Sequence, residues 1–360
     1  MKLISILFTS LLSALAASAQ TQAKTQNLVL ITLDGIRWQD VFRGADSSML
    51  FGDKYMKKFA DRWREMYWDQ NIKTGRQQLM PFLWRTLKDE GQIFGNRDIG
   101  SEVSVKNPYN ISYPGYSEIF TGYADKNINS NDLVKNPNAN FMEYLSKLPE
   151  FRGKVAAFAS WDRFPFILNE ERSGFMVNGG YEEIQGNTSE TQKTLNAMQN
   201  VAPRIVSQSS RPDYITYFQA KEYMRLNKPR VISIGLANTD DMAHDGNYGF
   251  YLDHMHAMDA YISDMWDFLQ SDPFYKDQTT LFITVDHGRG EGDAWTGHGK
   301  APHSNEIWFA VAGPGIPAKG EVKTTEQLYQ NQFAQTLCSL LGVVFKSSNE
   351  IGGKIEELTK

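Results

Sequence analysis

Acidic and histidine side chains follow three short apolar stretches of this sequence. The set comprises Asp34 after the first stretch, Asp240 and His244 after the second, Asp286 and His287 after the third, and His298 and His303 just beyond. Carboxylate oxygens and imidazole nitrogens of this kind suit zinc, with manganese as the alternative. Because the set is large enough for two ions, the sequence predicts two divalent metal ions in one shared site.

Each of these residues also has an ordinary structural explanation when it is taken alone. Asp34 could cap a following turn, and the i, i+4 pair Asp240 and His244 could be a surface contact on a helical turn. Asp286-His287 is more specific, because a buried strand that runs into two adjacent ionisable groups needs compensation for both. The joint occurrence of the whole set favours the metal site.

Ser112 is the candidate nucleophile. It precedes Tyr113-Pro114-Gly115, a rigid turn, and residues 116–121 are expected to begin a helix whose N-terminal amides face an anion. A serine hydroxyl activated there by a divalent ion could attack phosphorus. The alternative is a serine that only caps the helix.

Five short apolar runs rich in β-branched residues are predicted to be buried parallel strands, and they cover 27–35, 154–162, 231–238, 280–288 and 307–315. Helical patterns lie between them, and the clearest has a Tyr and Met stripe from Tyr251 to Leu269. The predicted fold class is therefore α/β, a mostly parallel sheet sandwiched by helices. The C-terminal strand ends of such a sheet converge on its ligand crevice, which would collect the ionisable groups.

Two further expectations concern histidines that fall outside this pattern. His254 and His256 fall off the stripe and are expected at the surface. His303 is expected to be a bystander, because the strand that follows it should enter the sheet from the edge opposite the crevice.

Helices are expected over 78–90 and 326–341, and the second should bury Cys338. A single cysteine excludes a disulfide framework and any multi-cysteine metal site.

The first nineteen residues have the pattern of an export signal. Lys2 provides a positive charge, an apolar stretch follows, and Ala17-Ser18-Ala19 is a small-residue cleavage pattern. The alternative, a membrane anchor, is disfavoured because the apolar run is short for a bilayer span. We expect an exported, periplasmic or secreted protein in which 20–360 form one domain, with insertions near 40–77 and 181–228. No later segment is apolar and long enough to be a span.

The composition restricts the partners. Of 360 residues, 41% are hydrophobic and 22% are charged, as in folded globular proteins. Lys and Arg together number 37 against 42 Asp and Glu, a formal net charge of −5. This balance provides no basic field for nucleic acid, so a small-molecule substrate is expected. The oligomeric state stays open.

Taken together, these motifs resemble the alkaline phosphatase superfamily, most closely its type I phosphodiesterase/nucleotide pyrophosphatase-like branch. The resemblance extends from Asn27 to about Pro317. The matching motifs are Asp34-Gly35, Ser112-Tyr113-Pro114, Thr121-Gly122, the pair Asp240 and His244, Asp286-His287-Gly288 and His298-Gly299.

The resemblance implies a role for each of these residues. One metal would be held by Asp240, His244 and His298, and the other by Asp34, Asp286 and His287 with Ser112. Aligning Ile128 with the family's Ile-x-x-Asn pattern selects Asn131 to bind a phosphoryl oxygen. The implied activity is hydrolysis of a phosphate ester through a phosphoserine, which water then hydrolyses.

Related activities on the same scaffold are the alternatives, namely a sulfatase-like or a phosphoglyceromutase-like enzyme. A formylglycine sulfatase is disfavoured because Tyr116 stands where that group needs Arg. The mutases carry an inserted domain, for which the stretch between Asn131 and Lys154 is short. The sequence does not distinguish an enzyme for phosphate monoesters from one for phosphate diesters. Extra cations for a monoester could come from Lys106, Arg163 and Arg289, and an apolar wall for a diester from Tyr113, Tyr116, Trp161 and Phe164.

Overall fold

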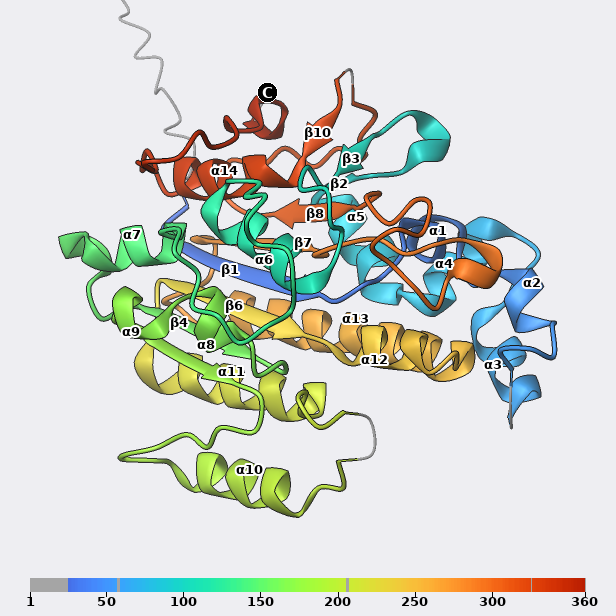
Figure 1. Ribbon diagram of the computed structural model, residues 1–360, viewed down its shortest axis with the longest axis horizontal. Helices are drawn as coiled ribbons and strands as arrows, with labels where there is room; N and C mark the ends of the chain where they lie inside the picture. The colour runs from blue at the N-terminus through green and yellow to red at the C-terminus, as the bar shows by residue number, and fades with distance from the viewer. Residues whose placement is uncertain (1–24, 57–58, 205–206, 325, 360) are drawn as a thin grey trace, which may run out of the picture.

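The molecule is built around a central sheet of eight strands (Figure 1). The computed structural model describes residues 25–56, 59–204, 207–324 and 326–359. The strand order is β5-β4-β6-β1-β7-β8-β2-β9. Their bounds are β1 Asn27–Leu33, β2 Gly91–Phe94, β4 Val155–Ala159, β5 Met176–Gly179, β6 Val231–Leu236, β7 Thr279–Thr284, β8 Phe309–Ala312 and β9 Gly320–Glu321. A separate pair joins β3 Val103–Ser104 to β10 Leu328–Tyr329.

Helices cover both faces of this sheet. The main ones are α1 Trp38–Arg43, α2 Ser47–Leu50, α3 Ala60–Tyr67, α4 Ile72–Leu79, α5 Lys88–Glu90, α6 Ser112–Thr121, α7 Phe141–Lys147, α8 Phe164–Ile167, α9 Glu170–Ser173, α10 Glu190–Val201, α11 Asp213–Asn227, α12 Asn238–His244, α13 Tyr248–Ser271 and α14 Phe333–Leu340. In Figure 1, α11 and α13 lie on one side of the sheet, and α6, α7 and α14 lie on the other. The predicted α/β class with a mostly parallel, helix-covered sheet is confirmed.

The five predicted strands are β1, β4, β6, β7 and β8, each shorter than its apolar run. One prediction about them is wrong: β8 pairs antiparallel with both β7 and β2. A buried apolar run has the same composition in either direction when both faces of the sheet are covered, so the sequence pattern does not reveal strand direction. The short strands β2, β5 and β9 lacked a pattern long enough to predict.

The stripe of α13 is buried as predicted, by Tyr251, Met255, Met258, Ile262, Met265 and Leu269. The expectation for His254 and His256 is wrong, because both are partly buried. Helix α13 packs against α3 and α4 as well as α11, so residues beside the stripe are also covered. The Nδ1 atom of His256 lies 3.0 Å from the carbonyl oxygen of Leu79, and burial lowers the pKa of His254.

The two other predicted helices are shorter than expected. Pro81 follows the end of α4, and a new helix continues through the π-helical turn Leu83–Leu87 into α5. Gly91 then begins β2 instead of a loop. The last helix begins only at Phe333, because β10 and the 3₁₀ turn Gln330–Gln332 precede it. Cys338 is fully buried in this helix, as predicted.

The expected leader 1–19 lies outside the described residues. Within the described ranges, no helix is both long and apolar enough to span a bilayer. The stretch 40–77 forms α2 to α4 and the end of α1, while 181–228 forms α10 and α11. Helix α11 packs against β4 and β6. The domain boundaries themselves stay a prediction.

Candidate metal centre and nucleophile

Three adjacent parallel strands bring the predicted ligands together. Strand β1 lies between β6 and β7 at the middle of the sheet. Asp34 follows β1, α12 with Asp240 follows β6, and Asp286 follows β7. Since the C-terminal ends of parallel strands meet at one edge, residues far apart in the sequence become neighbours there.

Asp34, Asp286 and His287 form a buried group whose ligand atoms all lie within 4.8 Å of one another. Each carboxylate has one oxygen bonded to the protein: Tyr116 Oη donates to Asp34 Oδ2 at 3.1 Å, and the Gly35 N–H donates to Asp286 Oδ1 at 3.1 Å. The other two oxygens, Asp34 Oδ1 and Asp286 Oδ2, are buried without a hydrogen-bond partner. They lie 3.5 and 3.3 Å from His287 Nε2.

The charges of this group are uncompensated. Burial, and then the charge of Asp286, raises the pKa of Asp34 well above its usual range. Burial, and then the charge of Asp240, raises the pKa of Asp286 to about 8. Two buried carboxylates with orphaned oxygens that face one imidazole nitrogen fit a divalent cation, which would satisfy both oxygens and favour the charged forms.

Asp240, His244 and His298 form a second group beside the first. His244 Nε2 lies 3.2 Å from Asp240 Oδ2 and 3.1 Å from His298 Nε2, while His298 Nε2 lies 4.0 Å from Asp240 Oδ1. His298 is also stacked on His287, with ring centroids 3.9 Å apart, so His287 stands between the two groups. The structure thus brings all six predicted ligands to one edge.

Backbone carbonyls orient two of the imidazoles. His287 Nδ1 lies 2.9 Å from the Gly288 oxygen, and His298 Nδ1 lies 3.1 Å from the Asn110 oxygen. An Nδ1–H that donates to a carbonyl leaves the Nε2 lone pair free for a metal. Burial lowers the pKa of His298 to about 4, so its ring is neutral near pH 7, as a metal ligand requires.

Ser112 is the first residue of α6, and it does not cap the helix. The capping position belongs to Ile111. Ser112 Oγ instead lies 3.3 Å from His287 Nε2. Helix α6 can approach the end of β7 because Gly115 has no side chain: a Cβ there would lie 2.3 Å from the Asp286 carbonyl oxygen. Ser112 is therefore not used as the cap of this helix, and its role as the nucleophile stays a prediction.

Asn131 lies beside this helix terminus. Its Oδ1 accepts a hydrogen bond from the Tyr113 N–H at 2.9 Å, which fixes the amide and leaves Nδ2 as a donor. Pro114 has no N–H, and the Gly115 N–H donates to Ile111. Of the first helical amides, only that of Ser112 is without a hydrogen bond to described residues. The helix N-terminus was predicted to present several backbone N–H groups to an anion. Only the Ser112 N–H is available among the first four helical residues, beside the side-chain amide of Asn131.

Sequence reasoning missed the part played by Arg289, which was considered only as a charge for substrate. Its guanidinium is buried and pairs with Asp240 Oδ1. Two carbonyl oxygens hold it there: Nε donates to Trp295 at 2.8 Å and Nη2 to Thr296 at 2.7 Å. Burial would raise the pKa of Asp240, but Arg289 and the nearby imidazoles hold it well below its usual range. The arginine directly after Asp-His-Gly was the available signal.

We expect Arg289→Gln to weaken metal binding by about 10- to 100-fold, the size typical of lost outer-shell partners. The reason is that Asp240 would lose the group that fixes its Oδ1. A competition titration with a chromophoric chelator measures the affinity, and circular dichroism checks folding. Arg230→Gln is the matched control, since Arg230 also donates to a carbonyl, that of Gln26, but is only partly buried and makes no contact with the predicted ligands. Equal metal affinity of the Arg289 variant and wild type would contradict this role.

His303 does not join the centre. It is half-exposed, and its Nδ1 lies 3.0 Å from Glu306 Oε1. The argument that predicted this was wrong, because antiparallel β8 begins at the same edge as the centre. In this structure the His303 side chain pairs with Glu306 although its backbone is not remote from the centre, and its role as a bystander stays a prediction.

No family model and no curated protein matches the chain, but solved structures match most of its length. A protein in the alkaline phosphatase superfamily from Vibrio parahaemolyticus has 17% identity and a TM-score of 0.55, over 90% of this chain and 68% of its own. The alkaline phosphatase PafA has 10% identity and a TM-score of 0.61, over 94% and 99%. The phosphonate monoester hydrolase of Agrobacterium radiobacter has 14% identity and a TM-score of 0.57, over 93% and 77%. Sulfatases also match.

These likenesses cover 90 to 94% of this chain at 10 to 17% sequence identity. The motif resemblance is thereby confirmed at the level of the fold, and the chain has the α/β fold of the alkaline phosphatase superfamily.

Proposed function

We propose that this protein is an exported two-metal hydrolase of phosphoric esters that acts through a phosphoserine on Ser112. The observation that carries the proposal is the position of Ser112 Oγ. It lies at a helix terminus that it does not cap, and it faces His287 Nε2 beside two carboxylate oxygens that lack partners. A hydroxyl, an unpaired amide and a set of metal ligands meet there, as nucleophilic attack on an anionic ester requires.

Two divalent ions would be held by this chain, zinc or alternatively manganese. Asp34, Asp286, His287 and Ser112 would bind one, and Asp240, His244 and His298 the other. When bound, such ions lower the pKa of a coordinated hydroxyl and stabilise the charge that develops on attacking and leaving oxygens.

The side chains then carry the reaction in two steps. Ser112 Oγ loses its proton to solvent and bonds to phosphorus, the bond from phosphorus to the ester oxygen breaks, and the departing alcohol takes up a proton. The Asn131 Nδ2 group and the Ser112 N–H donate to a non-bridging oxygen and hold the ester in place. Water then bonds to the phosphorus of the phosphoserine, the bond from phosphorus to Ser112 Oγ breaks, Oγ takes up a proton, and the phosphate product leaves.

The charge of the cavity indicates which esters fit. A cavity of about 200 Å³ opens on the centre and is lined by Asp34, Ser112, Asn131, Trp161, Ser209, Ser210, Ala237, Asp240, Asp241, His244 and His298. None of these described residues is Lys or Arg. Lys106 lies over the Tyr329 ring, and Arg163 donates to the Asn131 carbonyl and pairs with Asp162. Beyond the two metal ions, a second negative charge on the substrate would therefore meet no Lys or Arg among the described lining residues, and it would face Asp241.

This environment favours an ester with one negative charge, such as a phosphodiester. Of the four aromatic residues considered for an apolar wall, only Trp161 lines the cavity. Tyr113, Tyr116 and Phe164 are buried and do not line it. The half-buried Trp161 indole would contact the second substituent. A sulfate monoester also carries a single charge, so a sulfatase-like activity is the second candidate.

Three substrates with the same leaving group test the proposal: bis(4-nitrophenyl) phosphate, 4-nitrophenyl phosphate and 4-nitrophenyl sulfate. We expect purified protein to contain close to two divalent ions per chain and to have a kcat/KM for the diester at least about tenfold above that for the monoester, equivalent to about 1.4 kcal/mol. Treatment with a chelator should abolish turnover, and added zinc or manganese should restore it.

Each arm of this experiment has a contradicting result. Full activity in metal-free protein would overturn the two-metal hydrolase. Preference for the monoester would overturn the inference about charge while leaving the hydrolase intact. Preference for the sulfate would assign the second candidate instead. N-terminal sequencing of protein recovered outside the cytoplasm tests export, with Gln20 as the expected first residue.

A further inference from the structure

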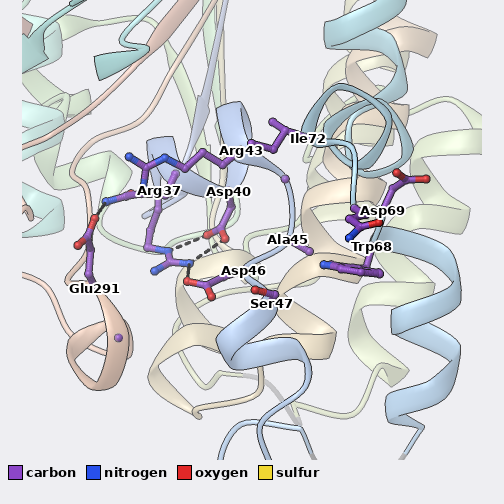
Figure 2. A pocket seen from close by; sticks show the side chains of 14 residues that line it. Arg37, Asp40, Arg43, Ala45, Asp46, Ser47, Trp68, Asp69, Ile72 and Glu291 are labelled. Atoms are coloured by element: carbon purple, nitrogen blue, oxygen red, sulfur yellow. Dashed lines mark hydrogen bonds and ion pairs between the residues drawn. The ribbon is translucent and has the colours of Figure 1, made fainter. Parts of the chain in front are cut away.

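A second cavity, of about 450 Å³, lies at the same edge of the sheet as the metal centre. Its walls come from α1, the start of α2, the turn between α3 and α4, and the loop after β7 (Figure 2). Two of these segments begin at metal ligands, since Arg37 and Asp40 follow Asp34, and Glu291 follows His287. This size is within the range of pockets that hold small ligands. The proposed hydrolysis makes no use of it.

Part of the wall is rigid and internally neutral. The guanidinium of Arg37 donates to both oxygens of Asp40 at 2.7 Å, and both side chains are buried. The hydroxyls of Tyr248 and Tyr251 also donate to Asp40, at 2.7 and 3.0 Å. Arg37 is therefore fixed and its charge is balanced, so it does not present a free cation to a ligand.

Other groups on the wall have unused hydrogen-bonding capacity. Gln39 is buried, its Nε2 donates to Glu291 Oε1 at 2.8 Å, and its Oε1 has no partner. Among the described residues, the Trp68 indole N–H and the Ser47 hydroxyl have no hydrogen-bond partner either. The cavity thus offers unpaired acceptors and unpaired donors together.

This mixture decides between classes of ligand. An anion would meet the carboxylates of Asp46, Asp69 and Glu291, all of which line the cavity. The Arg43 guanidinium on the same wall is already paired with Asp98 at 2.7 Å. A metal ion would need converging ligands, yet the candidate metal groups of the described residues are only those of the centre above. Hydroxyl groups satisfy both sets of atoms, because each hydroxyl donates and accepts.

Trp68 adds an apolar surface to this polar cavity. Figure 2 shows its indole across the cavity from Arg37, with Asp46 and Ser47 between them. Trp68 is half-buried, with its ring centroid 5.0 Å from that of Phe51 in an edge-to-face contact. A rigid aromatic side chain combines contact area with a polar N–H. Such a surface suits the C–H face of a sugar ring, whose hydroxyls project outward toward polar groups.

We propose that this cavity binds a carbohydrate, with Trp68 against the sugar ring and Gln39 and Glu291 hydrogen-bonded to its hydroxyls. The proposal is independent of the hydrolase function, because none of these three residues belongs to the metal centre. The loop after β7 contributes His287 to the metal centre and Glu291 to this cavity, where Glu291 accepts a hydrogen bond from Gln39.

A glycan array probed with the purified full-length protein tests the proposal, followed by calorimetric titration of the retained glycan. We expect Trp68→Ala and Gln39→Ala each to weaken binding by at least tenfold, while Trp68→Phe retains part of the affinity. Trp161→Ala is the matched control, because Trp161 is also half-buried with an unpaired indole N–H but lines the metal-centre cavity instead. Its affinity for the glycan should equal that of wild type.

Three results would overturn the proposal. The first is that no glycan on the array is retained by wild-type protein. The second is unchanged affinity in Trp68→Ala, provided that its melting temperature shows it to be folded. The third is loss of binding in Trp161→Ala alone, which would move the glycan to the metal centre. Spermidine is titrated in parallel, and tight binding of spermidine that Trp68→Ala abolishes, without any glycan binding, would assign the cavity to an organic cation.

Discussion

Ser112→Ala is expected to lower kcat by about 10⁴-fold or more while leaving the fold and the metal content near those of wild type. The large loss follows because no other side chain at this helix terminus could form the covalent intermediate. The small structural effect follows because Ser112 Oγ makes a single contact, 3.3 Å to His287 Nε2, and does not cap α6. Removal of one such contact costs about 1 kcal/mol of unfolding free energy.

Ser117→Ala is the matched control for this variant. Ser117 is buried in the same helix, where its Oγ accepts a hydrogen bond from Asn136 Nδ2 at 2.9 Å, and it does not line the cavity at the centre. This variant should lose a similar amount of stability and keep its activity. Acid quenching of wild type during turnover, followed by mass spectrometry, should find the phosphoryl group on Ser112. Near wild-type kcat in Ser112→Ala would replace the phosphoserine scheme with direct attack by water.

His298→Ala is expected to lose about one metal ion per chain and at least 10²-fold in rate, whereas His303→Ala should cost little. His298 Nε2 lies 3.1 Å from His244 Nε2, and a carbonyl orients its ring toward the centre. His303 is half-exposed and paired with Glu306. Metal analysis and rates of both variants measure the difference. Full occupancy in the His298 variant together with depletion in the His303 variant would exchange the two roles.

The contrast between these histidines shows how far the sequence could lead. The ligand set could be predicted because each ligand follows a central strand, and parallel strands deliver their ends to one edge whatever happens at the margins of the sheet. The direction of β8 could not be predicted, because the composition of its apolar run is the same for a parallel and an antiparallel strand. The prediction that His303 is not a ligand therefore rested on a wrong direction for β8. In the structure its side chain pairs with Glu306 instead, and this pairing depends on a turn that the sequence does not specify.

The contact made by Arg289 and the burial of residues beside the stripe of α13 could not be predicted from the sequence, for a different reason. The contact of Arg289 with Asp240 joins two loops that follow different strands, so it exists only once the sheet has formed. The partial burial of His254 and His256 depends likewise on which helices pack against α13. Periodicity identifies the buried stripe of a helix but not how many neighbours it has. The roles assigned to Ser112, Asn131 and the metal ligands remain predictions, and the variants above test those of Ser112 and His298.

The antiparallel direction of β8 has a consequence for how this protein can diversify. Thr284 at the end of β7 is paired with Phe309 at the start of β8, so the residues between them leave and re-enter the sheet at one place. An insertion at the exposed tip, Glu291 to Asp293, would shift no strand register. Doubling a loop's length costs only about 0.6 kcal/mol in closure entropy. This tip borders the proposed carbohydrate cavity, so ligand preference there can be redesigned by loop grafting without repacking the core.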